Sequence, residues 1–182
     1  KGYYTQVLEE LKLLPEKVEK LFGEEDQIAA LAKKYHRKDQ VFYIGRGLDS
    51  GVSYEGSLKL KEISYINSFA IAAGELKHGT IALMEEETLV FALATQDFLY
   101  EKMVSNVEEI KARGARVVAI AKEGRTEIEQ VADEVIYIPP CMDEVSPVLA
   151  VIPLQIFAYY VAKERGCNID KPKNLAKSVT VE

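Results

Sequence analysis

The sequence contains little cysteine and no surplus of positive charge. Its 182 residues include only two cysteines, Cys141 and Cys167, whose separation fits no metal-binding motif. Buried free thiols are therefore expected rather than a disulfide or a zinc site, and neither a metal nor another cofactor is expected. The formal net charge of -6 argues against a general nucleic-acid binder, which needs a basic face. Local basic groups remain compatible with binding of a small anion.

The sequence also lacks the patterns of membrane and secreted proteins. No apolar run approaches the roughly 18 residues that a transmembrane helix needs. The opening residues Lys1-Gly2-Tyr3-Tyr4 do not have the architecture of a signal peptide. With 48% hydrophobic and 29% charged residues, a chain of this length is expected to form one domain. These features predict a cytoplasmic globular protein that contacts neither membrane nor nucleic acid.

Short apolar runs alternate with segments of helical periodicity. Continuous short runs are typical of strands covered on both faces, as in parallel sheets. The alternation predicts an α/β fold, with a doubly wound, flavodoxin-like parallel sheet of five strands over residues 1–166 and an appended tail at 167–182. Pro15 implies either a kink or a new helix near Leu14. Strands are expected at 41–44, 69–73, 88–93, 116–120 and 134–138, and helices at 5–22, 24–35, 50–66, 98–113, 126–131 and 147–165.

Two features follow the first predicted strand. The turn Gly45-Arg46-Gly47 permits close backbone approach to an anion, although by itself such a pair of glycines favours an ordinary tight turn. In the next helix, Glu55, Lys59 and Glu62 fall at i, i+4 and i+7, which places two carboxylates and an amine on one narrow stripe. The stripe is consistent with solvated ion pairs. The functional alternative is a carboxylate whose basicity and position are set by the amine.

Single histidines and a tail lysine are further candidates. His78 lies in a polar turn bracketed by Gly74 and Gly79, where it is either a surface residue or a general acid/base with a pKa near neutrality. His36 ends a predicted helix beside basic residues and is interpreted as structural. Lys177 is the sixth residue counted from the end of the sequence, in a segment without a periodic core pattern. Lysine amines form Schiff bases with carbonyl compounds, so Lys177 is a candidate for such chemistry.

Three segments together resemble the glucosamine-6-phosphate synthase family, also called the isomerising glutamine–fructose-6-phosphate aminotransferases. The resemblance is to the second sugar isomerase (SIS) subdomain and the C-terminal tail, and it covers nearly the whole chain in the right order. The three motifs together are highly specific. They are Glu55-Gly56-Ser57-Leu58-Lys59-Leu60-Lys61-Glu62-Ile63-Ser64-Tyr65-Ile66, Ala73-Gly74-Glu75-Leu76-Lys77-His78-Gly79 and the tail from Asn174 to Glu182.

The resemblance implies chemistry on fructose 6-phosphate, which the family opens, aminates with ammonia from glutamine and isomerises to glucosamine 6-phosphate. By resemblance, Glu62 is the carboxylate that moves a proton between C1 and C2. Lys59 supports charge on the sugar oxygens, and Glu55 is a second carboxylate of the site. A 1,2-proton shift needs one base that lifts and returns the same proton, and a carboxylate on a rigid helix suits that task. Neither a metal nor a cofactor is implied.

The resemblance assigns the remaining residues as well. His78 corresponds to the ring-opening histidine, which in this family reaches the active site of the partner subunit, so a homodimer is implied. Lys177 corresponds to the tail lysine that forms a Schiff base with the open ketose, and Ala176 is implied to contact the substrate.

Two expected features of the family are missing from this sequence. The chain begins with Lys1 rather than the nucleophilic cysteine of the glutaminase domain, and it has no Ser-Gln-Ser-Gly-Glu-Thr-like phosphate loop, which belongs to the first SIS subdomain. The sequence therefore predicts a fragment without those two domains. On its own, this fragment is expected to lack glutamine-dependent synthesis and to bind fructose 6-phosphate poorly.

Two other functions remain open on the same fold. One is a non-catalytic sugar-phosphate-binding regulatory module, which needs neither a proton-shuttling carboxylate nor a catalytic tail. The other is a deglycase of phosphorylated fructosamines, against which the segment from Asn174 to Glu182 favours the synthase.

Overall fold

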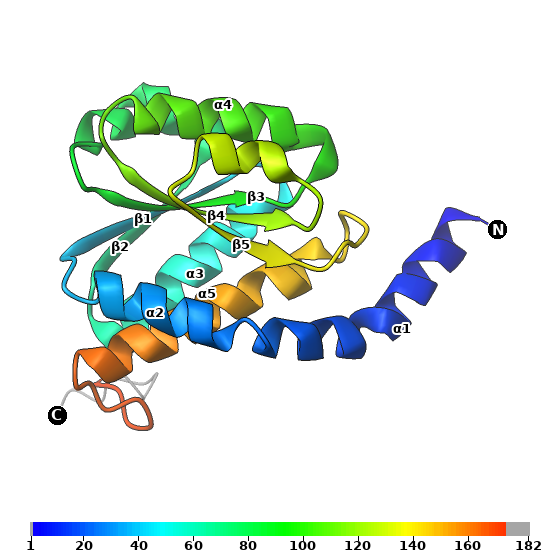
Figure 1. Ribbon diagram of the computed structural model, residues 1–182, viewed down its shortest axis with the longest axis horizontal. Helices are drawn as coiled ribbons and strands as arrows, with labels where there is room; N and C mark the ends of the chain where they lie inside the picture. The colour runs from blue at the N-terminus through cyan, green and yellow to red at the C-terminus, as the bar shows by residue number, and fades with distance from the viewer. Residues whose placement is uncertain (1, 174–182) are drawn as a thin grey trace, which may run out of the picture.

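A five-stranded parallel sheet forms the centre of the computed structural model, which describes residues 2–173 (Figure 1). The strand order is β2-β1-β3-β4-β5, and every pairing is parallel. This is the doubly wound, flavodoxin-like order, so the predicted fold class is confirmed. The strands are β1 Gln40–Gly45, β2 Asn67–Ala72, β3 Leu89–Ala94, β4 Arg116–Lys122 and β5 Glu134–Ile138. The helices are α1 Tyr3–Phe22, α2 Glu25–Tyr35, α3 Leu48–Ser64, α4 Tyr100–Lys111 and α5 Ser146–Glu164.

Several segments differ from the sequence-based expectation in type or length. Four short stretches are 3-10 helices, η1 Ala73–His78, η2 Thr80–Leu83, η3 Asp97–Leu99 and η4 Thr126–Gln130. Two of these replace parts of predicted α-helices, at the start of 98–113 and at 126–131. The helix α1 is continuous through Pro15, and Figure 1 shows it bending along its length. A kink is what a proline without an amide hydrogen produces inside a helix.

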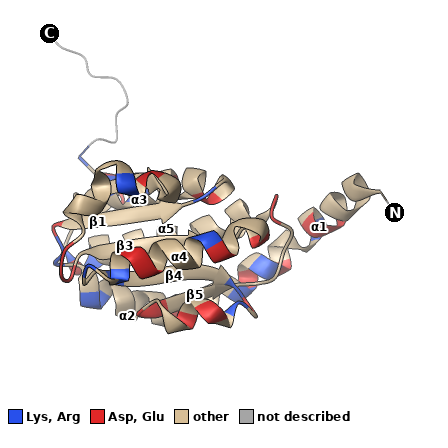
Figure 2. Ribbon diagram, turned by 90° about the horizontal axis from the view of Figure 1, so that it is seen from above, with Lys and Arg blue, Asp and Glu red and all other residues tan. Residues whose placement is uncertain are grey.

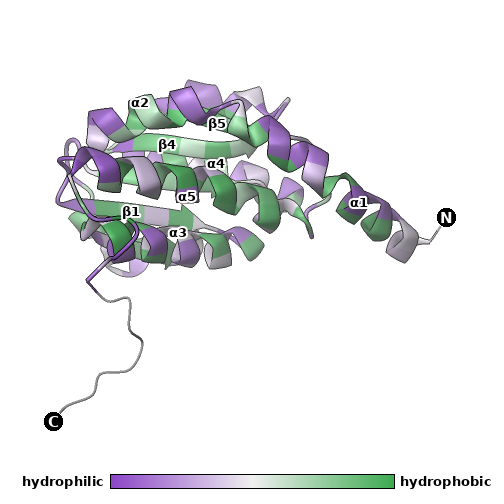
Figure 3. Cartoon of the chain, turned by 90° about the horizontal axis from the view of Figure 1, so that it is seen from below, coloured by the Kyte–Doolittle hydropathy of each residue, from purple (hydrophilic) through white to green (hydrophobic). Residues whose placement is uncertain are grey.

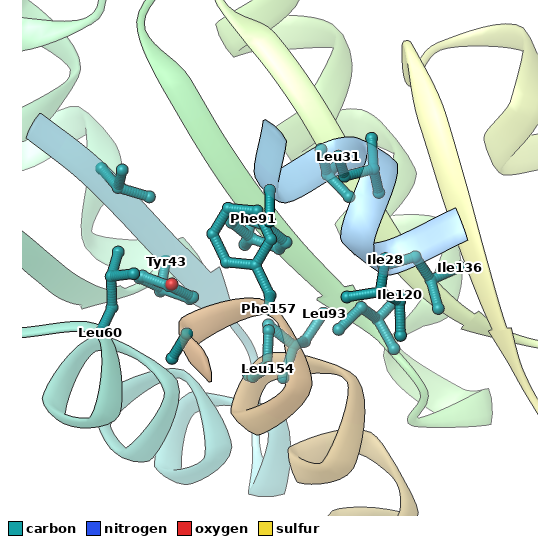
Figure 4. Close-up of a cluster of buried hydrophobic side chains, with 14 of the residues drawn as sticks. Ile28, Leu31, Tyr43, Leu60, Phe91, Leu93, Ile120, Ile136, Leu154 and Phe157 are labelled. Carbon is teal, nitrogen blue, oxygen red and sulfur yellow. The ribbon is translucent and has the colours of Figure 1, made fainter. Parts of the chain in front are cut away.

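Two apolar layers cover the faces of the sheet. On one face, α2, α3 and α5 pack against Tyr43, Phe91 and Ile120 of the strands (Figure 4). On the other face, α4, η1 and η4 cover Phe42 and Val90. Because both faces are buried, β3 is apolar along its whole length, which explains why its sequence reads as a continuous run.

The helix α5 is the central helix of the first layer. Contrary to the expectation from the sequence, it is long and apolar enough to cross a membrane, but half of that apolar window is buried inside the fold. It contacts α2 and α3 along its length, and Figure 3 shows its green, apolar surface between them. This is the environment of a core helix in a globular protein.

Both cysteines are free thiols, as the sequence predicts, but each is half-buried rather than fully buried. Burial raises the pKa of the Cys141 thiol to about 11, so this thiol stays protonated near neutral pH.

A half-buried carboxylate joins α4 to the start of β4. Asp133 accepts hydrogen bonds from Lys111 at 2.7 Å, from Arg116 at 3.1 Å and from the amide of Val117 at 2.7 Å. Burial by itself would raise the pKa of Asp133, but these three donors outweigh it and lower the pKa.

Candidate functional site

A tight turn at the end of β1 sets the start of α3, the helix that carries most of the predicted site. Gly45 is required there, because a Cβ would lie 2.5 Å from the backbone carbonyl of Asp49. Gly47 has a φ of 57°, a left-handed conformation that favours glycine. The Asp49 carboxylate then accepts hydrogen bonds from the amide and the hydroxyl of Thr95, at 2.7 and 2.5 Å. These bonds fix the first turn of α3 to the end of β3.

The three residues of the predicted stripe lie together on α3. The Lys59 ammonium is 2.8 Å from Glu62 Oε2 and 3.6 Å from Glu55 Oε1. The hydrogen bond to Glu62, with the charge of Glu55, raises the pKa of Lys59 although partial burial opposes it. Lys59 therefore stays charged while it touches both carboxylates. The Glu55/Lys59/Glu62 stripe is the juxtaposition that the spacing predicts.

The stripe remains accessible from solvent. The side chains of Glu55, Lys59 and Glu62 are 43%, 33% and 46% exposed. Ion pairs this exposed contribute only about 0–1 kcal/mol to folding. Stability alone is therefore a weak reason for the arrangement, and the carboxylates are open to a ligand.

The stripe runs along α3 away from the edge of the sheet where ligands of doubly wound folds usually bind, and Glu62 lies toward the opposite edge. α3 starts at the carboxyl end of β1 and rises 1.5 Å per residue, so Glu62 is about 21 Å further along the axis from Leu48. Glu62 is thus close to the amino end of β2, five residues before Asn67. The carboxyl-edge rule places the Gly45-Arg46-Gly47 turn correctly but not the second half of the stripe.

The described part of the C-terminal segment returns to this same end of α3. Arg165 donates hydrogen bonds to the carbonyl oxygens of Ser64 at 3.0 Å and of His36 at 2.7 Å. The amide of Lys173 donates to the hydroxyl of Tyr65 at 2.9 Å, and its ammonium lies 4.7 Å from the centre of the Tyr65 ring. Lys173 is therefore held at Tyr65, which directly follows α3 and lies three positions after Glu62 in the sequence.

Tyr65 is also in an unusual conformation. Its φ of 62° is left-handed, which is uncommon for a residue other than glycine, and its amide donates to the carbonyl of Lys61 at the end of α3. Strained residues of this kind concentrate at functional positions. The contact of Tyr65 with the C-terminal segment was not predicted from the sequence. Predicted site residues Ala176 and Lys177 lie outside the described residues.

His78 does not join the stripe within one chain. It ends η1, which follows the carboxyl end of β2, so it lies at the opposite edge of the sheet from Glu62. Its side chain is 75% exposed, with Nε2 3.9 Å from Glu75. The Nδ1 atom of His36 lies 2.8 Å from the carbonyl oxygen of Lys33 in the last turn of α2. This local contact agrees with a structural role for His36.

A buried polar cluster that the sequence analysis missed occupies the carboxyl edge of the sheet. The Lys122 side chain is only 5% exposed and lies between Asp143 at 2.6 Å and Asp97 at 3.0 Å. Burial would lower the pKa of Lys122, but these two carboxylates raise it. Gln96 and Ser146 extend the cluster through a hydrogen bond of 2.8 Å. A lysine directly after the apolar run at 117–121 is the sequence signal that could have indicated this cluster.

The chain belongs to the SIS domain family, which matches residues 34–165. Along almost its whole length it is similar to glutamine–fructose-6-phosphate aminotransferase (isomerizing) from Caldanaerobacter subterraneus, with 60% identity over 178 residues, 98% of this chain. The enzyme of the same name from Clostridium tetani is 53% identical over 177 residues. The chain spans only 29% of the length of each of these two relatives.

A solved structure agrees with these similarities. The C-terminal domain of glucosamine-fructose-6-phosphate aminotransferase from Francisella tularensis superposes with a TM-score of 0.83 and 32% identity. The match covers 90% of this chain and 46% of that one. The predicted resemblance to the isomerase region of this family is therefore confirmed.

Proposed function

We propose that this chain is the catalytic SIS unit of an isomerising glutamine–fructose-6-phosphate aminotransferase, in which it performs the ketose–aldose step. The observation that carries the proposal is Lys59, held by Glu55 and Glu62 on an accessible face of α3. Glu62 moves the proton between C1 and C2 of the open sugar. Lys59 stabilises negative charge on the sugar oxygens, and Glu55 holds Lys59 in place.

The geometry supports this division of roles. The Glu62 carboxylate meets Lys59 through Oε2 and is nearly half exposed, so a substrate can approach it. The Lys59 ammonium, 2.8 Å from the Glu62 carboxylate, is positioned to stabilise the negative charge that develops on an enediolate oxygen. Proton transfer by such a positioned carboxylate contributes about 10²–10⁴-fold to a rate.

The remaining groups of the proposed site come from a second subunit, from the C-terminal segment and from further domains. His78 opens the sugar ring in the site of a second subunit of a homodimer, which agrees with its exposed position far from Glu62. Lys177 forms the Schiff base with the ketose, and Ala176 contacts the sugar. The anchoring of Lys173 on Tyr65 supports their approach to this end of α3. The glutaminase domain and the first SIS subdomain complete the enzyme.

The two half-buried free thiols support a reducing, cytoplasmic location for this enzyme.

Substitution of Glu62 in the parent enzyme tests the proposal. Glu62→Gln keeps the shape of the side chain and removes the base, so we expect glucosamine 6-phosphate formation to fall about 10²–10⁴-fold while glutamine hydrolysis continues. Glu108→Gln, at an exposed position of α4, is the matched control and leaves both activities unchanged. Equal loss of both activities in Glu62→Gln contradicts a catalytic role and indicates a structural one.

The chain itself provides a second test. Incubated with fructose 6-phosphate and glutamine, the 182 residues alone are expected to form no product, because the glutaminase and the phosphate loop are elsewhere. Robust product would refute this division of the enzyme. Calorimetric binding of a hexose phosphate together with normal isomerisation in Glu62→Gln would instead favour a regulatory sugar-phosphate module.

A further inference from the structure

A basic pocket opens at the carboxyl edge of the sheet, where β1 and β2 end and α4 begins. The pocket has a volume of about 220 Å³, which leaves room for a phosphate group and bound water, since one water takes about 30 Å³. We call it the Arg46 pocket. Its principal lining residues are Arg46, Gly74, Lys77, Lys102, Ser105 and Asn106.

The guanidinium of Arg46 is oriented before any ligand arrives. Its Nε donates to Oδ1 of Asn106 at 2.9 Å, and Asn106 is itself only 6% exposed. Gly74 lies flat against the group, because a Cβ there would be 3.4 Å from Nη1 and 3.6 Å from Nη2. The missing side chain at position 74 therefore leaves space over the guanidinium. A guanidinium with fixed Nε presents its remaining donors in the planar geometry that phosphate oxygens accept.

The charges of the pocket are not balanced by carboxylates. Within residues 2–173, no carboxylate oxygen lies within 4.0 Å of the side-chain nitrogens of Arg46 or Lys102. Lys77 is paired with Glu109 at 2.8 Å. Three cations and one carboxylate leave a formal charge of +2 in a chain whose net charge is -6. A phosphate dianion matches that charge.

The pocket is built from three separate elements. Arg46 follows β1, Lys77 belongs to η1, and Lys102 lies in the first turn of α4, where the helix dipole also favours an anion. Ser105 adds a hydroxyl donor one turn further along. The convergence of donors from distant parts of the sequence on one cavity distinguishes the pocket from scattered surface lysines, which Figure 2 shows elsewhere on the molecule.

From this geometry we propose that the Arg46 pocket binds a phosphate group, either as free phosphate or as part of a small phosphorylated ligand. The pocket is distinct from the Glu55/Lys59/Glu62 stripe, because Glu62 lies toward the amino edge of the sheet and the pocket opens at the carboxyl edge. The proposal therefore does not depend on the proposed isomerase function.

Titration of the 182-residue chain with inorganic phosphate at constant ionic strength tests the proposal. The amide resonances of Gly74, Ser105 and Asn106 are followed by two-dimensional NMR. We expect saturable shifts at these three residues, with a dissociation constant on the order of 1 mM or tighter. Absence of saturation, or shifts confined to other parts of the chain, would overturn the proposal.

Two lysine variants separate the pocket from general charge effects. Lys102→Gln removes an exposed pocket ammonium that makes no ion pair among residues 2–173, and we expect phosphate affinity to fall at least about fivefold. Lys33→Gln makes the same charge change at an exposed position of α2 and leaves the affinity unchanged. Equal affinities in the two variants would refute a specific site. Arg46→Lys keeps the positive charge but loses the planar set of guanidinium donors, so it also weakens phosphate binding.

A second titration with glucose 6-phosphate distinguishes the two sources of the phosphate group. Tighter binding than inorganic phosphate at the same three amides supports a phosphorylated sugar, and equal or weaker binding there supports free phosphate. Loss of isomerase activity in Glu62→Gln has no bearing on these shifts, so the two proposals fail independently.

Discussion

Two glycines of α3 offer a direct measurement of how tightly this helix packs against α5. A Cβ at Gly56 would lie 2.5 Å from Cδ1 of Leu154 and 3.1 Å from Cε1 of Tyr43, and both of these side chains are fully buried. A Cβ at Gly51, in the same helix, meets nothing within 4 Å. The same substitution by alanine therefore probes a crowded and an open position of one helix.

The expected magnitudes follow from this contrast. Alanine is favoured over glycine inside a helix by about 0.5–1 kcal/mol, so Gly51→Ala should stabilise the chain by that amount. Gly56→Ala makes the same gain but must displace buried atoms, and overpacking of this kind costs about 1–3 kcal/mol. The unfolding free energy of Gly56→Ala should therefore be about 1–3 kcal/mol below that of Gly51→Ala.

Urea unfolding measures this difference, with the midpoint expected to move and the slope to stay constant. A further variant identifies the contact, because Leu154→Ala removes the atom that Gly56→Ala would strike. In the Leu154→Ala background, the added methyl group at position 56 should lose most of its penalty, a coupling of about 0.5–3 kcal/mol. Equal unfolding free energies for the two single alanine variants, or strict additivity with Leu154→Ala, would refute the packing geometry.

Three further predictions follow from the polar contacts. Lys122→Met leaves Asp143 without its cation, whereas the half-exposed Asp97 keeps Arg125 at 2.9 Å, so the unfolding free energy in urea should fall by about 1–3 kcal/mol. A loss below about 0.5 kcal/mol contradicts the contact of Lys122 with Asp143. The pKa of Asp133 is lower in the folded chain than its unfolded value of about 3.9, so its ionised carboxylate stabilises the fold above that pH. This stabilisation is lost as the pH falls through the folded-state pKa. Asp133→Asn should therefore flatten the acid limb of a stability–pH curve, and an unchanged limb would disprove the reasoning. Tyr65→Gly relieves the strain of the left-handed backbone, so the unfolding free energy should not fall. The same change removes the contact of Lys173, so trypsin should cleave after Lys173 faster than in the parent chain. An unchanged cleavage rate argues against the contact as an anchor.

Local patterns account for most of the fold and for the centre of the candidate site. Strands β3 and β4 are recognisable because burial on both faces requires continuous apolar runs. The Lys59 contacts follow from the helical repeat alone, which places residues three and four apart on one face. The 3-10 segments were harder to predict, because their short hydrogen-bonded turns depend on neighbouring contacts more than on periodicity.

The sequence by itself determined which side chains share the face of α3, since helical spacing is a local property of the backbone. Only the tertiary structure decided that Glu62 lies toward the amino edge of the sheet with the anchor of Lys173, and that His78 lies at the opposite edge. It also decided that Arg46, Lys77 and Lys102 line one pocket, because they come from segments joined only by the crossovers of the parallel sheet. Contacts between residues distant in sequence depend on the packing of whole elements, which the spacing of residues along one element does not encode.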